Sequence, residues 1–143
     1  MEVHHTAAFL LIGNELLSGK IEERNFIELA RTLRSIGIDF ARAVVVPDDL
    51  DVIANEVREL SDKFDVVFTS GGIGPTHDDI TIDGVAKAFG VEAKVDAKLV
   101  EMLKAAYGER YTDAHARMAL VPEGADLKTS AEVPWPTIVM KNV

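Results

Sequence analysis

The chain has 143 residues, of which 48% are hydrophobic and 27% are charged, a composition typical of one folded domain. Its 15 lysines and arginines against 24 aspartates and glutamates leave a formal net charge of −9, which disfavours nucleic acid and anionic membranes as partners. The absence of cysteine excludes disulfides and thiolate metal sites, and the longest apolar run, residues 7–12, is too short to cross a bilayer. We therefore expect a cytoplasmic protein.

Strand-like and helix-like patterns alternate from the N-terminus onward. Residues 7–12 are a short apolar block that predicts a strand buried on both faces. Apolar residues at spacings of three and four predict a helix over residues 25–36, with Gly37 as its C-terminal stop. Residues 38–46 are rich in β-forming side chains and predict a second strand.

The middle of the chain repeats this alternation. An amphipathic pattern over residues 50–60 predicts a helix, which either Asp48 or Asp49 can cap. Residues 64–68 (FDVVF) predict a third strand. It leads into a glycine-rich loop over residues 70–79.

The last third contains mainly helical patterns. Thr81 can cap a short helix that ends before Gly90, and further helical patterns cover residues 96–106 and 112–120. Residues 137–140 are strand-like.

Strands that alternate with helices at these spacings predict a three-layer α/β fold, with a mostly parallel sheet and helices on both faces. Ligands of such sheets bind beyond the carboxyl ends of the strands. Three loops are therefore candidates for a binding site, over residues 13–24, 47–49 and 70–79.

The third loop has three glycines within four residues: Gly71, Gly72 and Gly74. Glycines allow left-handed dihedrals and close backbone approach, so that their N–H groups can point together at an anion. The hydroxyls of Ser70 and Thr76 are possible further donors to a phosphate. The alternative is a turn that only reverses the chain.

Two acidic residues follow the last of these glycines after three intervening residues. Asp78 and Asp79 would repel a bound phosphate unless a cation lies between them, and Mg²⁺ usually binds one or two carboxylates together with substrate phosphates. The sequence therefore points to a divalent metal at Asp78 and Asp79. The alternative is that Asp79 and Asp83 only stabilise the start of the following helix.

The first two loops offer further polar groups beside the same sheet edge. The first contains Glu15 and Lys20, and Lys20 could neutralise a second phosphate. The alternative is a turn shaped by Gly13 and Gly19 with a solvated lysine. Asp48, directly after the second strand, either reaches the same ligand or caps the helix that follows.

Residues 69–81, TSGGIGPTHDDIT, closely resemble the T-G-G-x-G-P-T-x-D-D-x-T signature of the molybdopterin-binding (MoaB/Mog-like) domain. This segment resembles the version of the signature found in the competence-damage protein CinA and in the corresponding domain of FAD synthases, with Ser70 in place of a glycine. Residues 12–25, 46–48 and 120–124 also match elements of this family.

The resemblance implies that the loop glycines hold a phosphate and that Asp48 and Asp79 are the catalytic acids, placed against substrate and metal. Taken together with the loops above, the expected ligand-binding residues are Gly13, Glu15, Lys20, Asn25, Ser70, Gly71, Gly72, Gly74, Pro75, Thr76 and Thr81.

Three functions are candidates: the resemblance implies the first two, and the apolar C-terminal strand together with Trp135 points to the third. The CinA-like branch resembles a metal-dependent pyrophosphatase acting on ADP-ribose or FAD, which the paired Asp78 and Asp79 favour. The molybdenum-cofactor branch binds molybdopterin and supports its adenylylation with Mg-ATP. The third is a non-catalytic module that mainly forms a homo-oligomer, a dimer or a trimer. Because relatives would continue into an L-P-G-x-P-x-E element, we expect residues 1–143 to be one domain shortened at its C-terminus.

Overall fold

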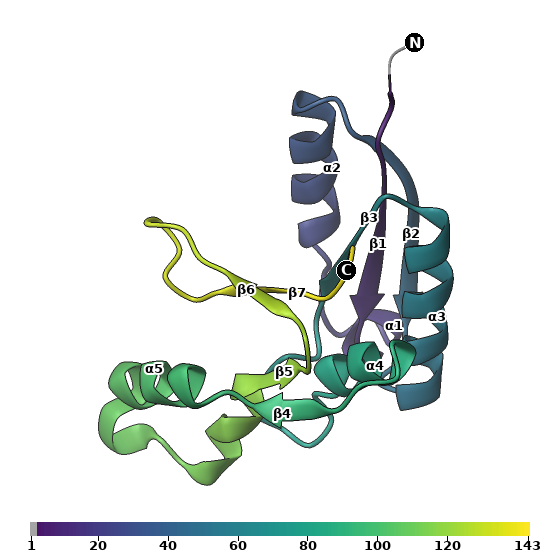
Figure 1. Cartoon of the computed structure of the whole chain (residues 1–143). Helices are drawn as coiled ribbons and strands as arrows, with labels where there is room; N and C mark the ends of the chain where they lie inside the picture. The colour runs from purple at the N-terminus through teal and green to yellow at the C-terminus, as the bar shows by residue number, and fades with distance from the viewer. Residues whose placement is uncertain (1–2) are drawn as a thin grey trace.

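The computed structural model describes residues 3–143, and its centre is a three-stranded parallel sheet. In the order of pairing, the strands are β2 (Asp39–Val46), β1 (Thr6–Ile12) and β3 (Val66–Ser70). The helices that cover it are α2 (Asn25–Ser35) on one face, and α3 (Leu50–Lys63) and α4 (Thr81–Ala88) on the other (Figure 1). The expected α/β fold with helices on both faces is confirmed.

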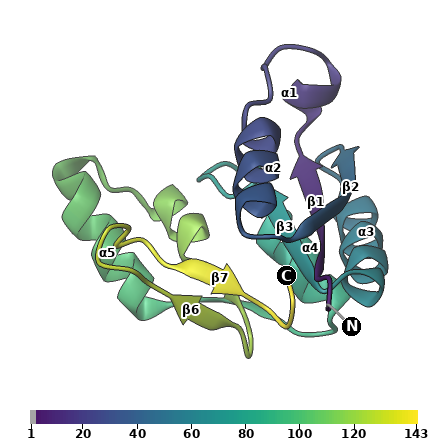
Figure 2. The same cartoon turned by 90° about the horizontal axis from the view of Figure 1, so that it is seen from above.

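A smaller lobe, residues 93–139, stands to one side of this sheet (Figure 2). It contains β4 (Ala93–Val95), α5 (Ala97–Tyr107), the 3-10 helices η1 (Gly108–Arg110) and η2 (Asp113–Ala119), β5 (Leu120–Pro122), β6 (Asp126–Lys128) and β7 (Thr137–Val139). In it, β4 pairs with β5 and β6 with β7, both antiparallel. A short helix, α1 (Asn14–Leu17), follows β1 in the larger part.

The apolar sequence of β1 places it at the middle of the sheet, where both of its faces are buried. Successive side chains of a strand point to opposite faces. Leu10 and its even-numbered neighbours pack into a core with Ile53 and Val57 of α3. On the other face, the Phe9 ring faces Phe40 of β2, with 6.4 Å between the ring centroids.

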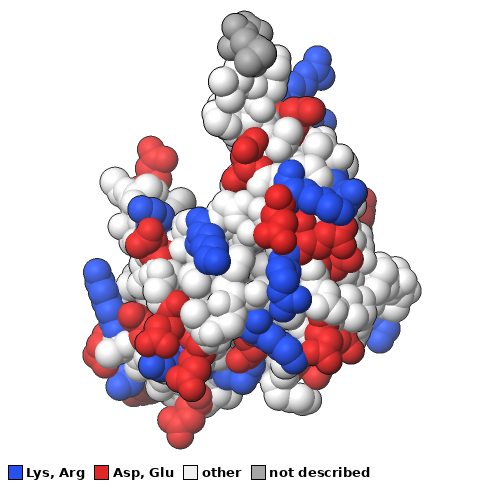
Figure 3. Space-filling model, turned by 45° about the vertical axis from the view of Figure 1, so that its right-hand side comes forward, with Lys and Arg blue, Asp and Glu red and all other residues white. Residues whose placement is uncertain are grey.

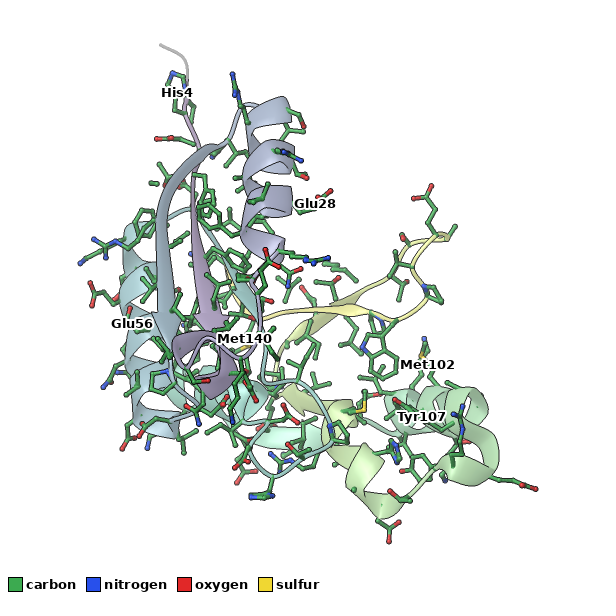
Figure 4. All side chains as sticks on the ribbon, turned by 180° about the vertical axis from the view of Figure 1, so that it is seen from behind. His4, Glu28, Glu56, Met102, Tyr107 and Met140 are labelled. Carbon is green, nitrogen blue, oxygen red and sulfur yellow. The ribbon has the colours of Figure 1, made fainter. Side chains whose placement is uncertain are left out.

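A second apolar cluster holds the smaller lobe together. Leu99 and Leu103 of α5 pack with Ala119 of η2, and Trp135 covers them. Figure 4 labels side chains of both clusters: Met140 belongs to the larger core, and Met102 and Tyr107 belong to the smaller one.

Asp49 is the residue that caps α3. Its Oδ1 accepts a hydrogen bond from the backbone N–H of Val52 at 3.0 Å, which satisfies one of the free donors at the helix start. Of the two residues that the sequence offered for this role, Asp48 is therefore free to face elsewhere.

Acidic and basic side chains are interspersed on the face shown in Figure 3. One ion pair ties α4 to α3, since Lys87 Nζ lies 2.6 Å from Asp51 Oδ1. The hydrogen bond from Lys87 and its charge lower the pKa of Asp51. Within residues 3–143, no helix is both long and apolar enough to cross a membrane.

Three sequence-based expectations differ from the structure. The third strand begins at Val66 instead of residue 64, because Phe64 still ends α3 with a bond from its N–H to the Leu60 carbonyl. Residues 113–119 form a 3-10 helix. Thr81 does not cap α4, and the expectation that it does is wrong. It is the first residue of the helix, it is fully buried, and its hydroxyl donates to the Gly71 carbonyl at 2.7 Å.

Replacing Leu10 by alanine should destabilise the fold strongly. Leu10 is fully buried in the middle strand, so its removal leaves a cavity and should cost about 2–5 kcal/mol of unfolding free energy. Urea unfolding followed by circular dichroism measures this. Val45→Ala on β2, where the side chain is 43% exposed, is the control and should cost less than about 1 kcal/mol. Equal losses for the two variants would contradict the burial of β1.

Replacing Thr81 by valine tests the bond from α4 to the glycine turn. Valine keeps the shape but leaves the Gly71 carbonyl without its donor, which should cost about 1–3 kcal/mol. Thr32→Val is the matched control, because the Thr32 hydroxyl also donates to a backbone carbonyl, that of Glu28, but at an exposed position. The same urea titration should show a change within about 0.5 kcal/mol for this control. A Thr81→Val protein as stable as the control would refute the role of this bond.

Candidate functional site

A cleft of about 660 Å³ opens at the carboxyl ends of the three parallel strands, where the sequence analysis expected a ligand. It takes residues from the ends of all three strands, from α1, from the start of α2 and from the glycine-rich loop. The lining residues are Ile12, Glu15, Leu16, Ile21, Glu22, Glu23, Arg24, Asn25, Asp48, Ser70, Gly71, Gly72, Thr76, His77, Asp78 and Asp79.

The structure brings most of the expected site residues together in this cleft. The expected residues that line it are Glu15, Asn25, Asp48, Ser70, Gly71, Gly72, Thr76, Asp78 and Asp79. The expected residues outside its lining are Gly13, Lys20, Gly74, Pro75 and Thr81. Lys20 is exposed, Gly13 is buried with its N–H bound to the Val46 carbonyl, and Thr81 lies beneath the glycine turn.

The glycine turn requires glycine for steric reasons. Gly71 and Gly72 have φ angles of 92° and 65°, in the left-handed region. A Cβ at Gly71 would collide with the carbonyl oxygen of Ile12, and one at Gly72 would collide with the Thr81 hydroxyl. In the part of the chain that the structure describes, the backbone N–H groups of Gly72, Ile73 and Gly74 donate to no protein acceptor. They remain available to a ligand.

A tight turn from Thr76 to Asp79 follows the glycines. Oδ2 of Asp79 accepts from the backbone N–H of Thr76 at 2.9 Å and from its hydroxyl at 2.8 Å. The N–H of Asp79 donates to the Thr76 carbonyl at 3.1 Å. The Asp79 carboxylate is therefore fixed at the wall of the cleft, and the Thr76 hydroxyl is engaged with it.

Asp48 is held by the first loop. Its Oδ2 accepts from the N–H of Asn14 at 3.0 Å, and its own N–H donates to Asn14 Oδ1 at 3.1 Å. This reciprocal pair joins the start of α1 to the end of β2. Within residues 3–143, Oδ1 of Asp48 has no hydrogen-bond donor, so this oxygen can act on a ligand.

The start of α2 contributes the expected Asn25 and also Glu23, which the sequence analysis did not include. Asn25 Nδ2 donates to Ser70 Oγ at 2.8 Å, which joins α2 to the end of β3. Glu23 Oε1 accepts from the N–H groups of Asn25 and Phe26, so it satisfies free donors at the start of α2 while it lines the cleft. Its place two residues before the helix was the available signal.

The charge of the cleft is strongly acidic. Six carboxylates line it, from Glu15, Glu22, Glu23, Asp48, Asp78 and Asp79. Arg24 is the one lysine or arginine among the lining residues that the structure describes. A bound phosphate would therefore meet backbone donors and repelling carboxylates in the same space.

The described residues form no group of three or more carboxylate or histidine side chains placed to hold a metal ion by themselves. Asp78 faces His77, with 3.3 Å between Oδ1 and Nε2, and its side chain is 74% exposed. The expected pair of metal ligands is thus divided, with Asp79 tied to Thr76 and Asp78 turned to solvent. These donors suit a cation shared with ligand phosphates, because Mg²⁺ binds in proteins through as few as one or two carboxylates.

A second hollow of about 690 Å³ lies on the other side of the glycine turn, and Gly71 lines both. Its walls are mainly apolar and come from the smaller lobe and from α4, with Tyr107, Met118 and Trp135 among them. Ile73, Gly74 and Arg117 line this hollow and not the cleft, so Gly72 is the residue with a free N–H group that lines the cleft within this turn.

Comparison with known proteins shows which family the chain resembles. The sequence profile of a family described as a probable molybdopterin binding domain matches residues 8–141. A protein of Aeropyrum pernix is 39% identical over 129 residues, which are 88% of this chain and 48% of that protein. The chain thus spans about half the length of this relative.

Solved structures give the same result. The protein CinA from Thermoplasma acidophilum superposes with a TM-score of 0.82 and 32% sequence identity, over 93% of this chain and 80% of that one. The molybdopterin biosynthesis enzyme MoaB from Thermus thermophilus, at 17% identity, shares the fold with a TM-score of 0.56, over 82% of this chain and 74% of that one. The chain therefore belongs to the molybdopterin-binding domain family, in its CinA-like form.

Proposed function

We propose that the cleft binds a phosphorylated pterin or nucleotide, with its phosphate against the glycine turn. The observation that carries this proposal is the free N–H group of Gly72, which lines the cleft directly after a parallel strand. The free N–H groups of Ile73 and Gly74 follow in the same turn, at the border with the apolar hollow. Membership of the molybdopterin-binding family supports a ligand of this chemistry.

The acidic lining makes a divalent cation part of the proposed ligand. Between the phosphates and a cleft carboxylate, a cation such as Mg²⁺ would neutralise charge on the phosphate oxygens. Both expected catalytic acids keep Oδ1 without a hydrogen-bond donor among the described residues. We assign the proton-accepting role to Asp48, whose Oδ2 accepts one hydrogen bond, whereas Asp79 Oδ2 accepts two from Thr76.

The activity that we propose for the cleft is hydrolysis of a pyrophosphate bond, as in ADP-ribose or FAD. Asp48 Oδ1 would orient a water molecule and accept its proton. The water oxygen would form a bond to one phosphorus while the bridging P–O bond breaks, so that ADP-ribose would give AMP and ribose 5-phosphate. The proton would then pass from Asp48 to solvent. The free N–H group of Gly72 would stabilise charge on a phosphoryl oxygen.

The family description favours a second candidate, in which the same cleft binds molybdopterin and supports its adenylylation. Formation of adenylylated molybdopterin from ATP and molybdopterin, with no hydrolysis of ADP-ribose, would distinguish it from the first candidate.

Individually exposed apolar side chains favour a third candidate, a homo-oligomeric binding module. Ile27 and Ile36 at the two ends of α2 are 52% and 64% exposed, and Val45 of the edge strand β2 is 43% exposed. Contact between copies of the chain would remove these side chains from water, which supports the expected dimer or trimer.

The Asp48→Asn variant tests hydrolysis. With Mg²⁺ or Mn²⁺ present, it should hydrolyse ADP-ribose about 10²–10⁴-fold more slowly than the wild type, because it lacks the proposed base. The rate is measured as AMP released. The matched control is Asp49→Asn, which removes the same charge one residue along the chain, outside the cleft lining, and should leave the rate within about threefold of wild type.

If the wild type hydrolyses neither ADP-ribose nor FAD with either metal, the proposed hydrolase activity is wrong. Binding without hydrolysis would leave the binding proposal in place. Equal rates for Asp48→Asn and Asp49→Asn would show that Asp48 is not the base.

The Gly72→Asp variant tests binding by itself. ADP-ribose with Mg²⁺ should raise the melting temperature of the wild type and leave that of the variant unchanged, because the new side chain displaces the turn and adds negative charge. Gly90→Asp is the matched control, since Gly90 has a similar φ of 67° with open space around it, outside the cleft lining. Differential scanning fluorimetry should show the full ligand-induced shift for this control. Equal shifts in all three proteins would refute the phosphate site.

A further inference from the structure

The turn that carries Asp79 is held from outside the cleft by one arginine. Arg117 lies on η2 of the smaller lobe, 38 residues after Asp79 in the sequence. Its Nε donates to the Thr76 carbonyl at 3.1 Å, and its Nη2 donates to the Asp79 carbonyl at 2.9 Å. The guanidinium therefore binds both ends of the turn from Thr76 to Asp79.

The same guanidinium is anchored to α4. Nη2 of Arg117 lies 3.1 Å from Oδ2 of Asp83, in the first turn of that helix, and both side chains are only about one third exposed, at 33% and 35%. Asp83 thus neutralises the arginine and fixes its orientation, which is the geometry in which a planar guanidinium is preferred to an ammonium group.

The position of η2 is itself determined by the smaller lobe. Thr112 and His115 form a capping box at its start, with the N–H of Thr112 donating to His115 Nδ1 at 2.9 Å. At its end, Ala119 is fully buried against Leu99 and Leu103, and its carbonyl accepts from the N–H of Asp96 at 2.8 Å. Arg117 therefore starts from a fixed backbone.

A direct contact of Arg117 with a ligand in the cleft does not fit this arrangement. Arg117 is absent from the cleft lining and faces the apolar hollow behind the turn. Three of its N–H donor positions are directed at the turn and at Asp83. Its effect on the cleft must pass through the turn.

We infer that Arg117 is a positioning residue for the cleft: it holds the turn from Thr76 to Asp79, and through it the Asp79 carboxylate, in the orientation that receives the ligand. The smaller lobe thereby shapes a site that it does not line. As far as it concerns a ligand, this inference rests on the proposed function.

Two measurements on Arg117→Lys test it. Lysine keeps the charge, but one ammonium group cannot reproduce the two-nitrogen contact with both carbonyls. Without any ligand, amide hydrogen exchange at residues 76–79 should become about tenfold faster, since the loss of charge-assisted hydrogen bonds loosens the turn. By calorimetry, the affinity for ADP-ribose with Mg²⁺ should fall by about the same factor.

Three further variants separate positioning from general stability. Arg110→Lys makes the same chemical change at an exposed position of the same lobe and should match the wild type in both measurements. Asp83→Asn leaves Arg117 its two backbone carbonyls and should lose less affinity than Arg117→Lys. In an Asp79→Asn background, Arg117→Lys should weaken binding much less than it does alone, because the carboxylate that it positions is already gone.

Wild-type exchange rates at residues 76–79 in Arg117→Lys would overturn the inference. If the wild type binds ADP-ribose with Mg²⁺, faster exchange in Arg117→Lys with unchanged affinity would also overturn it. The same holds if Arg117→Lys weakens binding as much in the Asp79→Asn background as it does alone. Failure of the wild type to bind ADP-ribose would instead overturn the proposed ligand, and the exchange comparison would still decide whether Arg117 holds the turn.

Discussion

The crowding of two backbones at the ends of β1 and β3 is the constraint on which the cleft depends. These strands pair in parallel up to Leu11 and Ser70, so the chain must leave β3 directly beside the Ile12 carbonyl. That space admits Gly71 and no larger residue, in a left-handed conformation. Because the following residues leave the sheet there, their N–H groups lose a strand partner, and the hydroxyl of Thr81 closes the turn from beneath. The free N–H groups of the glycine turn are thus a consequence of close packing.

Electrostatics then restrict what those donors can bind. The free backbone amide of Gly72 favours an anion, whereas six carboxylates around the same cleft oppose one. A bare phosphate satisfies only the amide, and a bare cation satisfies only the carboxylates. A phosphate that carries its own cation would satisfy both, so under the proposed function the acidity of the cleft would select between charged ligands.

Local pattern was sufficient where local forces decide the structure. The apolar run of β1 and the stripe of α3 were predicted from periodicity, whereas the three-residue strands of the smaller lobe, such as β4, are too short to show any period. In the cleft, the loops were predictable because parallel strands end at one edge. Contacts between distant segments were not predictable. Thr81 has the sequence position of a helix cap, but its hydroxyl donates to a carbonyl ten residues earlier, and Asn25 at the start of α2 bonds to Ser70 at the end of β3.

The two apolar clusters are linked at the turn from Thr76 to Asp79. Its own hydrogen bonds are local, between Thr76 and Asp79, and short turns of this kind order little by themselves. The contact with Arg117 adds the packing of Leu99 and Leu103 to its support, since that packing fixes η2. Linkage is reciprocal: whatever orders the turn from the cleft side also stabilises the attachment of the smaller lobe. The packing of the smaller lobe, which lies outside the cleft lining, can in this way fix the orientation of the Asp79 carboxylate.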